Sequence, residues 1–201
     1  MQTKRFYFIF LLLSTMFLPG CTKKTDPDLV GTPGCTPPCW RGIQPGETHL
    51  DFATQLLSGM EKKGGGKLTI VSPAILEWKD NNGKSYNIYS AENVITRIVV
   101  PINSTNVGDA IALLGDPYNY VIDGIYQGGF SITLFYPQKG LAIVTGDRSQ
   151  FRIIPSMRVQ KVVFIGRTDL PGMIQTIYGD FGAKTVLSDT REWKGYGNIS
   201  P

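Results

Sequence analysis

The chain has 201 residues, a formal net charge of +4 and 42% hydrophobic residues. This length and composition are typical of one folded domain with a proper core, or of two very small ones. The charge is weak, and Lys and Arg do not cluster with aromatic residues. These features exclude a nucleic-acid surface of the usual basic kind.

The amino-terminal end has the pattern of a signal peptide. Lys4 and Arg5 precede an apolar run over residues 6–18, which is shorter than the roughly 20 residues that a membrane-spanning helix needs. The letters LPGC that follow, ending at Cys21, resemble the lipobox of bacterial lipoproteins. That resemblance implies removal of residues 1–20, a diacylglycerol on the Cys21 thiol and a second acyl group, such as palmitate, on the new amino terminus.

The lipobox predicts an exported protein that is held in the cell membrane or outer membrane by its lipid. Two or three acyl chains are what stable anchoring requires, and Lys23 and Lys24 would lie against anionic headgroups. An uncleaved helix, or an ordinary signal peptide with Cys21 as a plain thiol, is the alternative. No cofactor or metal is expected besides the covalent lipid.

Residues 21–39 are expected to form the anchor, a polar tether and a small cysteine loop. Outside the cytosol, with Cys21 used by lipid, Cys35 and Cys39 are even in number and close together, so a disulfide is the default prediction. A thiol-redox or copper-handling pair is the alternative, because Cys-x-x-x-Cys resembles the motif of the SCO copper chaperones. The only histidine, His49, would have to supply the third copper ligand.

Residues 40–102 are predicted to form a helix followed by an antiparallel meander. Thr48 and Asp51 resemble a capping box at the start of a helix over residues 49–61, and the basic stretch 61–67 is expected to be a solvated turn. Asn82-Gly83 predicts a type I′ hairpin between the first two strands, because both of its central residues need a positive φ. The three strands are expected over residues 74–79, 84–90 and 93–102.

Residues 103–166 repeat the pattern. Asn106 and Asp109 predict the start of a second helix, which Gly115 ends. Alternating apolar residues and turn residues then predict four strands, over residues 118–122, 129–137, 140–146 and 158–166.

Residues 167–201 are predicted to hold a third helix over 168–179, an edge strand over 181–189 and a tail. The pair Leu56-Leu57 recurs as Leu113-Leu114 at the same point of the second helix. The pattern therefore predicts an α+β fold with two tandem helix-plus-meander units and a third, carboxy-terminal helix.

Two short motifs carry a family resemblance. The string GIQPGET, residues 42–48, leads into a helix, and AIALLGDP, residues 110–117, ends one and leads into strands. With the lipobox and tether, these resemble the BamE-like outer-membrane lipoproteins and the related β-lactamase inhibitor protein fold. The resemblance implies a scaffold or inhibitor surface that binds an envelope or extracellular protein, without catalysis.

No catalytic residue is predicted. A Ser-His-Asp site would depend on His49 alone, and neither a Gly-x-Ser-x-Gly elbow nor a Ser-x-x-Lys motif occurs. Paired carboxylates could be drawn from Asp109, Asp116 and Asp123, but each is interpreted as a residue that serves a helix cap or a turn.

A candidate binding surface lies in the Tyr-rich and Gly-rich stretch 116–130. Tyr118, Tyr120 and Tyr126 would supply rigid contact area with a polar tip. The simpler interpretation is a strand pair with its hairpin, because tyrosine is also a common strand residue. A small ligand in a cleft between the two units is a further alternative.

Overall fold

The structure is a computed structural model that describes residues 26–30, 34–126, 129–147 and 152–198. Its first large helix is α3 (Leu50–Lys62), which is followed by four strands joined by short turns. These strands are β1 (Gly66–Ser72), β2 (Ile75–Asp80), β3 (Ser85–Ala91) and β4 (Val94–Pro101). The predictions of α3, β2, β3 and β4 are confirmed. Strand β1 was not predicted, and it begins at the last two residues of the expected solvated turn 61–67.

Two local predictions in this region are wrong. Thr48 does not cap α3, because its hydroxyl accepts a hydrogen bond from the Gln44 backbone N–H at 2.8 Å and the N-cap residue, His49, makes no side-chain cap bond. Positive φ angles on two adjacent hairpin residues occur not at Asn82-Gly83 but at Glu92 (50°) and Asn93 (63°), between β3 and β4. Asn82 is instead held by its backbone N–H, which donates to the Asp80 carboxylate at 2.9 Å.

The second half of the chain begins with helix α4 (Val107–Leu114). The Asn106 side chain accepts a hydrogen bond from the Asp109 N–H at 2.8 Å, and Gly115 ends the helix with a φ of 80°. Both cap predictions are confirmed. The elements that follow are β5 (Asn119–Tyr126), β6 (Gly129–Tyr136), the 3-10 turn η1 (Pro137–Lys139), β7 (Leu141–Asp147), β8 (Arg152–Ile153) and β9 (Val159–Ile165).

The carboxy-terminal region differs from its prediction. Helix α5 (Leu170–Asp189) is interrupted by non-helical backbone at Gly179 and then continues over the residues expected to form an edge strand. Ala183 and Val186, three residues apart, pack on the same core as the first half of the helix, and this is a helical spacing. The expected tail supplies two short strands instead, β10 (Arg191–Glu192) and β11 (Gly197–Asn198).

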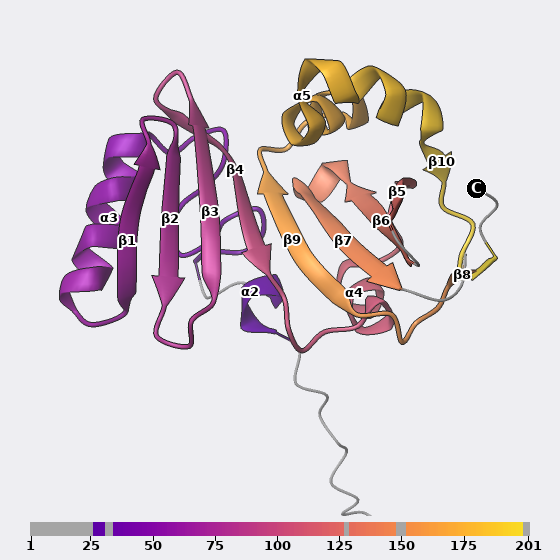
Figure 1. Cartoon of the computed structure of the whole chain (residues 1–201), viewed down its shortest axis with the longest axis horizontal. Coiled ribbons are helices and arrows are strands. Elements are labelled where there is room, and N and C mark those ends of the chain that lie inside the picture. The colour runs from indigo at the N-terminus through magenta and orange to yellow at the C-terminus, as the bar shows by residue number, and fades with distance from the viewer. Residues whose placement is uncertain (1–25, 31–33, 127–128, 148–151, 199–201) are drawn as a thin grey trace, which may run out of the picture.

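Nine of these strands form one antiparallel sheet in the order β1-β2-β3-β4-β9-β7-β6-β5-β10, while β11 pairs with β8. Figure 1 shows the two halves of the sheet side by side, and β4 pairs with β9 at their junction. One core joins both halves through α3 and α4. The α+β class is thus confirmed, while the tandem organisation into units 40–102 and 103–166 stays a prediction.

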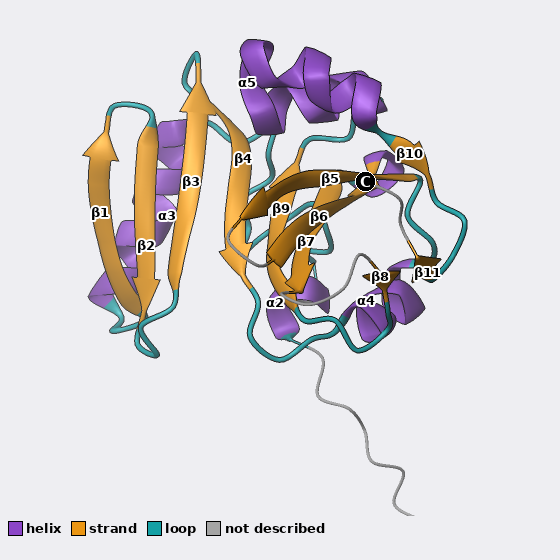
Figure 2. Ribbon diagram, turned by 45° about the vertical axis from the view of Figure 1, so that its right-hand side comes forward, coloured by secondary structure: helices purple, strands orange, loops and turns teal. Residues whose placement is uncertain are grey.

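The two halves of the sheet are covered differently. Helix α5 lies across β5, β6, β7 and β9 on the face opposite α4, where Met173 and Ile174 are fully buried against Phe135 and Ala142 (Figure 2). Strands of the second half are therefore buried on both faces. In the described part of the chain, no helix is long and apolar enough to cross a membrane.

Candidate functional site

The predicted cysteine pair lies just before the first large helix. The Cys35 and Cys39 sulfur atoms are 2.18 Å apart, at disulfide-bonding distance. Cys35 is buried, and its sulfur accepts a contact from the Gly42 N–H at 3.0 Å. His49 is exposed, and among the described residues no group of three His, Cys, Asp or Glu side chains is placed to hold a metal ion. Cys21 lies outside the described residues, and the role of the pair stays a prediction.

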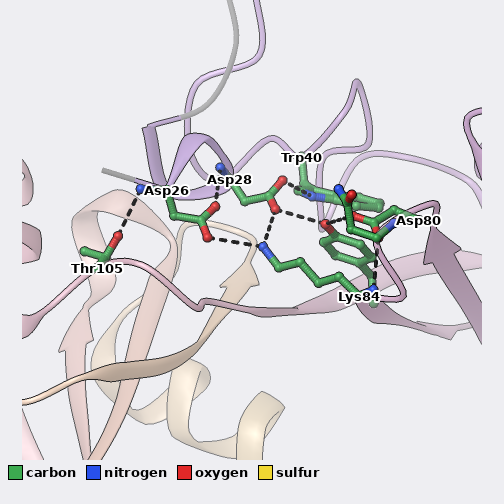
Figure 3. A network of polar contacts seen from close by, with 8 residues as sticks. Asp26, Asp28, Trp40, Asp80, Lys84 and Thr105 are labelled. Carbon is green, nitrogen blue, oxygen red and sulfur yellow. Dashed lines mark hydrogen bonds and ion pairs between the residues drawn. The ribbon is translucent and has the colours of Figure 1, made fainter. Parts of the chain in front are cut away.

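The end of the expected tether is docked onto the domain. Asp26 precedes the short helix α2 (Pro27–Val30), and its backbone N–H donates to the Thr105 hydroxyl at 3.0 Å. The Lys84 ammonium lies 3.3 Å from a carboxylate oxygen of Asp26 and 2.7 Å from one of Asp28 (Figure 3). Leu29 is fully buried in the main core. Residues 26–30, which were predicted to belong to a polar tether over 21–39, are therefore a folded part of the domain.

Aromatic residues complete this network. The Trp40 indole N–H donates to Asp28 at 3.2 Å, and the Tyr86 hydroxyl lies 3.1 Å from a carboxylate oxygen of Asp28 and 3.1 Å from one of Asp80. Burial and the two nearby carboxylates raise the pKa of Tyr86, which keeps its proton available for donation. The network joins the tether to the β2–β3 hairpin and stabilises their contact.

A second group of side chains forms a recess at the β10 edge of the sheet, which we call the aromatic cleft. It has a volume of about 610 Å³ and draws on three separate parts of the chain. Its lining residues are Asp116, Pro117, Tyr118, Asn119, Tyr136, Pro137, Gln138, Lys139, Glu192 and Trp193.

Strand pairing brings these three parts together. Glu192 of β10 lies opposite Asn119 of β5, so the next residue, Trp193, reaches the cleft. Its indole N–H donates to an Asp116 carboxylate oxygen at 3.3 Å. The Trp193 ring also packs edge-on against Tyr120, with ring centroids 6.4 Å apart. The cleft therefore depends on the register of a strand that contains two residues.

Tyr136 is the unusual residue of the cleft. The residue is only 4% exposed, and its buried hydroxyl has no hydrogen-bond partner among the described residues. Burial raises the pKa of Tyr136, and the nearby Tyr196 and Asp116 add to this shift. A buried hydroxyl without a partner destabilises the folded state, because it has lost its bonds to water. The same hydroxyl is a donor and acceptor that a bound group could use.

The three predicted binding tyrosines have different positions. Tyr118 lines the aromatic cleft and is 67% exposed, whereas Tyr120 is half-buried beside Trp193. The side chain of Tyr126 lies outside the described part of the structure. Sequence reasoning missed Tyr136 and Trp193. Trp193 and Tyr196 are aromatic residues in the segment that was predicted to be a tail. Their presence there was the sequence signal that could have indicated a site.

One of the three candidate acids was misplaced. Asp109 lies in the first turn of α4, and Asp116 follows that helix, as predicted. Asp123, however, lies within β5 rather than at a turn, and it accepts hydrogen bonds from the hydroxyls of Thr133 and Tyr178. Burial raises the pKa of Asp123. These bonds attach α5 to the sheet, which is a structural role.

Comparison of the chain with protein-family models, curated proteins and solved structures found no match. The resemblance to BamE-like lipoproteins stays a prediction.

We expect Lys84→Met to lower the free energy of unfolding by roughly 3 kcal/mol, because it leaves two buried carboxylates without their cation. The side chains of Lys84, Asp26 and Asp28 are 12%, 8% and 14% exposed. Urea unfolding of the full chain measures the change. Lys79→Met, at an exposed site of β2, is the matched control and should change stability little. Equal effects of the two variants would contradict a stabilising network.

We expect Tyr136→Phe to raise the free energy of unfolding by roughly 1 kcal/mol, because it removes a buried hydroxyl that has no partner. Tyr86→Phe is the control, since the Tyr86 hydroxyl has two carboxylate partners and its loss should lower stability. Thermal and urea unfolding of both variants check the opposite signs. A loss of stability in Tyr136→Phe would show that its hydroxyl has a partner in the folded protein.

Proposed function

We propose that the chain is a lipid-anchored, exported binding protein that recognises its partner through the aromatic cleft, without catalysis. The observation that carries this proposal is the cleft itself. It combines an exposed Tyr118 with a buried, unpartnered Tyr136 hydroxyl in one recess. Recesses that combine aromatic walls with a few convergent polar groups are typical of binding sites.

The partner expected from the sequence is an envelope or extracellular protein, and the alternative is a small ligand. The aromatic cleft supports a partner that inserts a group into it, because its polar atoms lie inside a recess rather than on a flat face. The small-ligand alternative was expected in a cleft between the two units, whereas the aromatic cleft lies at β10. Strands β7, β6 and β5 separate β10 from the β4–β9 junction, as Figure 1 shows for the strands themselves.

The docked tether supports the anchoring part of the proposal. Cys21, the proposed lipid-bearing residue, lies five positions before Asp26. At about 3.5 Å per residue, a fully extended chain spans roughly 18 Å over that interval. Because Asp26 and Asp28 are fixed to the domain by Lys84, a lipid on Cys21 would hold the whole domain close to the bilayer surface. A tether that was free up to Cys35 would have reached much further.

The anchor is tested by the intact mass of the protein extracted from the membranes of its own host. We expect a chain that begins at Cys21 and carries a diacylglycerol and an acyl group. Alkylation should reach Cys35 and Cys39 only after reduction, as a disulfide requires. Cys21→Ser is the control and should keep residues 1–20. Free alkylation of the pair, or a metal that travels with it, would favour the thiol-redox or copper alternative.

Binding through the cleft is tested by thermal unfolding of the full chain with an envelope extract of the host. A ligand that binds the folded state raises the melting temperature. We expect this rise in the wild type and in Phe181→Ala, which changes a fully exposed aromatic residue of α5 outside the cleft. It should be lost in Tyr118→Ala, whose exposed side chain contributes little to folding. An equal rise in all three proteins would place the binding elsewhere.

A further inference from the structure

We infer that the aromatic cleft binds a neutral saccharide, whose rings pack on Tyr118 and Trp193 and whose hydroxyl groups bond to Tyr136 and the cleft carboxylates. This inference rests on the proposed function and names the chemical class of its ligand. Three properties of the lining support it: the aromatic walls, the balance of donors and acceptors, and the charge.

The walls of the cleft suit the face of a sugar ring. One face of a pyranose presents C–H groups that carry a small positive charge, and the face of an aromatic ring carries the opposite charge. Tyr118 is 67% exposed and Trp193 is half-buried, so both have surface available for such contact. Pro117 and Pro137 add apolar surface without adding a backbone donor.

The polar groups of the cleft require a ligand that both donates and accepts hydrogen bonds. Asp116 and Glu192 only accept when they are ionised, whereas the amides of Asn119 and Gln138 do both. A sugar ring carries several hydroxyl groups, and each can donate one bond and accept others. A peptide has one N–H and one C=O per residue, so it offers fewer donors in the same volume.

The charges of the lining disfavour an anionic ligand. Two carboxylates, Asp116 and Glu192, face one cation, Lys139, which leaves the cleft with a net negative charge. A phosphate or a uronic acid would meet net repulsion from this lining. The volume of about 610 Å³ lies within the range of small-ligand sites and fits a short oligosaccharide.

The Tyr136 hydroxyl provides a specific reason for a polar ligand. Tyr136 lines the cleft, and its buried hydroxyl has no partner among the described residues. Trp193, beside it in the lining, follows β10, which two residue pairs join to β5 at the sheet edge (Figure 2). A sugar hydroxyl that bonds to Tyr136 would supply the partner that this group lacks in the described structure.

The experiment titrates the full chain with neutral di-, tri- and tetrasaccharides of glucose and of N-acetylglucosamine, in a detergent without a sugar headgroup. Trp40 and Trp78 are buried, so a change in tryptophan fluorescence reports mainly on Trp193. We expect binding that Tyr136→Phe weakens about tenfold, the worth of one hydrogen bond, while the same variant melts at a higher temperature. Phe181→Ala should bind as the wild type does.

The outcomes separate this inference from the proposed function. Binding of a neutral saccharide that Tyr118→Ala abolishes would support both. A second outcome is that no saccharide binds, while the envelope extract stabilises the wild type but not Tyr118→Ala, and protease treatment of the extract removes this effect. In that case the saccharide inference is overturned and the binding function stands. Equal binding of an anionic sugar would also overturn it. If neither saccharides nor the extract act through Tyr118, both proposals fail.

Discussion

The pairing of β4 with β9 is the contact on which the rest of the structure depends. Ile98 lies opposite Phe164 and Val100 opposite Val162, and all four side chains are fully buried. Without this pairing, each half of the sheet would expose a strand edge and part of its core. With it, α3 and α4 share one core, and the second half also binds α5 on its other face. The outer edges that remain are β1 and β10.

Structural features that depend on only a few neighbouring residues could be predicted from the sequence. Asn106 caps α4 as predicted, because an N-cap needs only a side-chain oxygen and a backbone N–H three residues later. Strand β1 was missed, since at the edge of the sheet both Ile70 and Val71 are exposed and the alternation of burial does not extend past Thr69. The first hairpin was misread because the Asp80 side chain, not a pair of positive φ angles, holds its turn.

The site was harder to predict than the fold because it depends on register between distant segments. Tyr118 was identified from composition, but its partner Trp193 joins it only because Glu192 pairs with Asn119. The tether network has the same origin, since Asp28 and Lys84 are 56 residues apart. Neither contact can be recognised from a pattern of neighbouring residues. In each, a segment without a helix or strand pattern in the sequence packs against an edge strand or a hairpin of the sheet.

The tether network and the aromatic cleft differ in how well their polar groups are satisfied. In the tether network, Tyr86 has carboxylate partners for its hydroxyl, and Lys84 has two counter-charges. In the cleft, the equally buried Tyr136 hydroxyl has none among the described residues. A folded protein usually tolerates such a cost where function requires the group. The satisfied network stabilises the fold at the tether. The proposed recognition through the cleft draws on the unpartnered Tyr136 hydroxyl, since a group that destabilises the free protein would strengthen a complex that satisfies it.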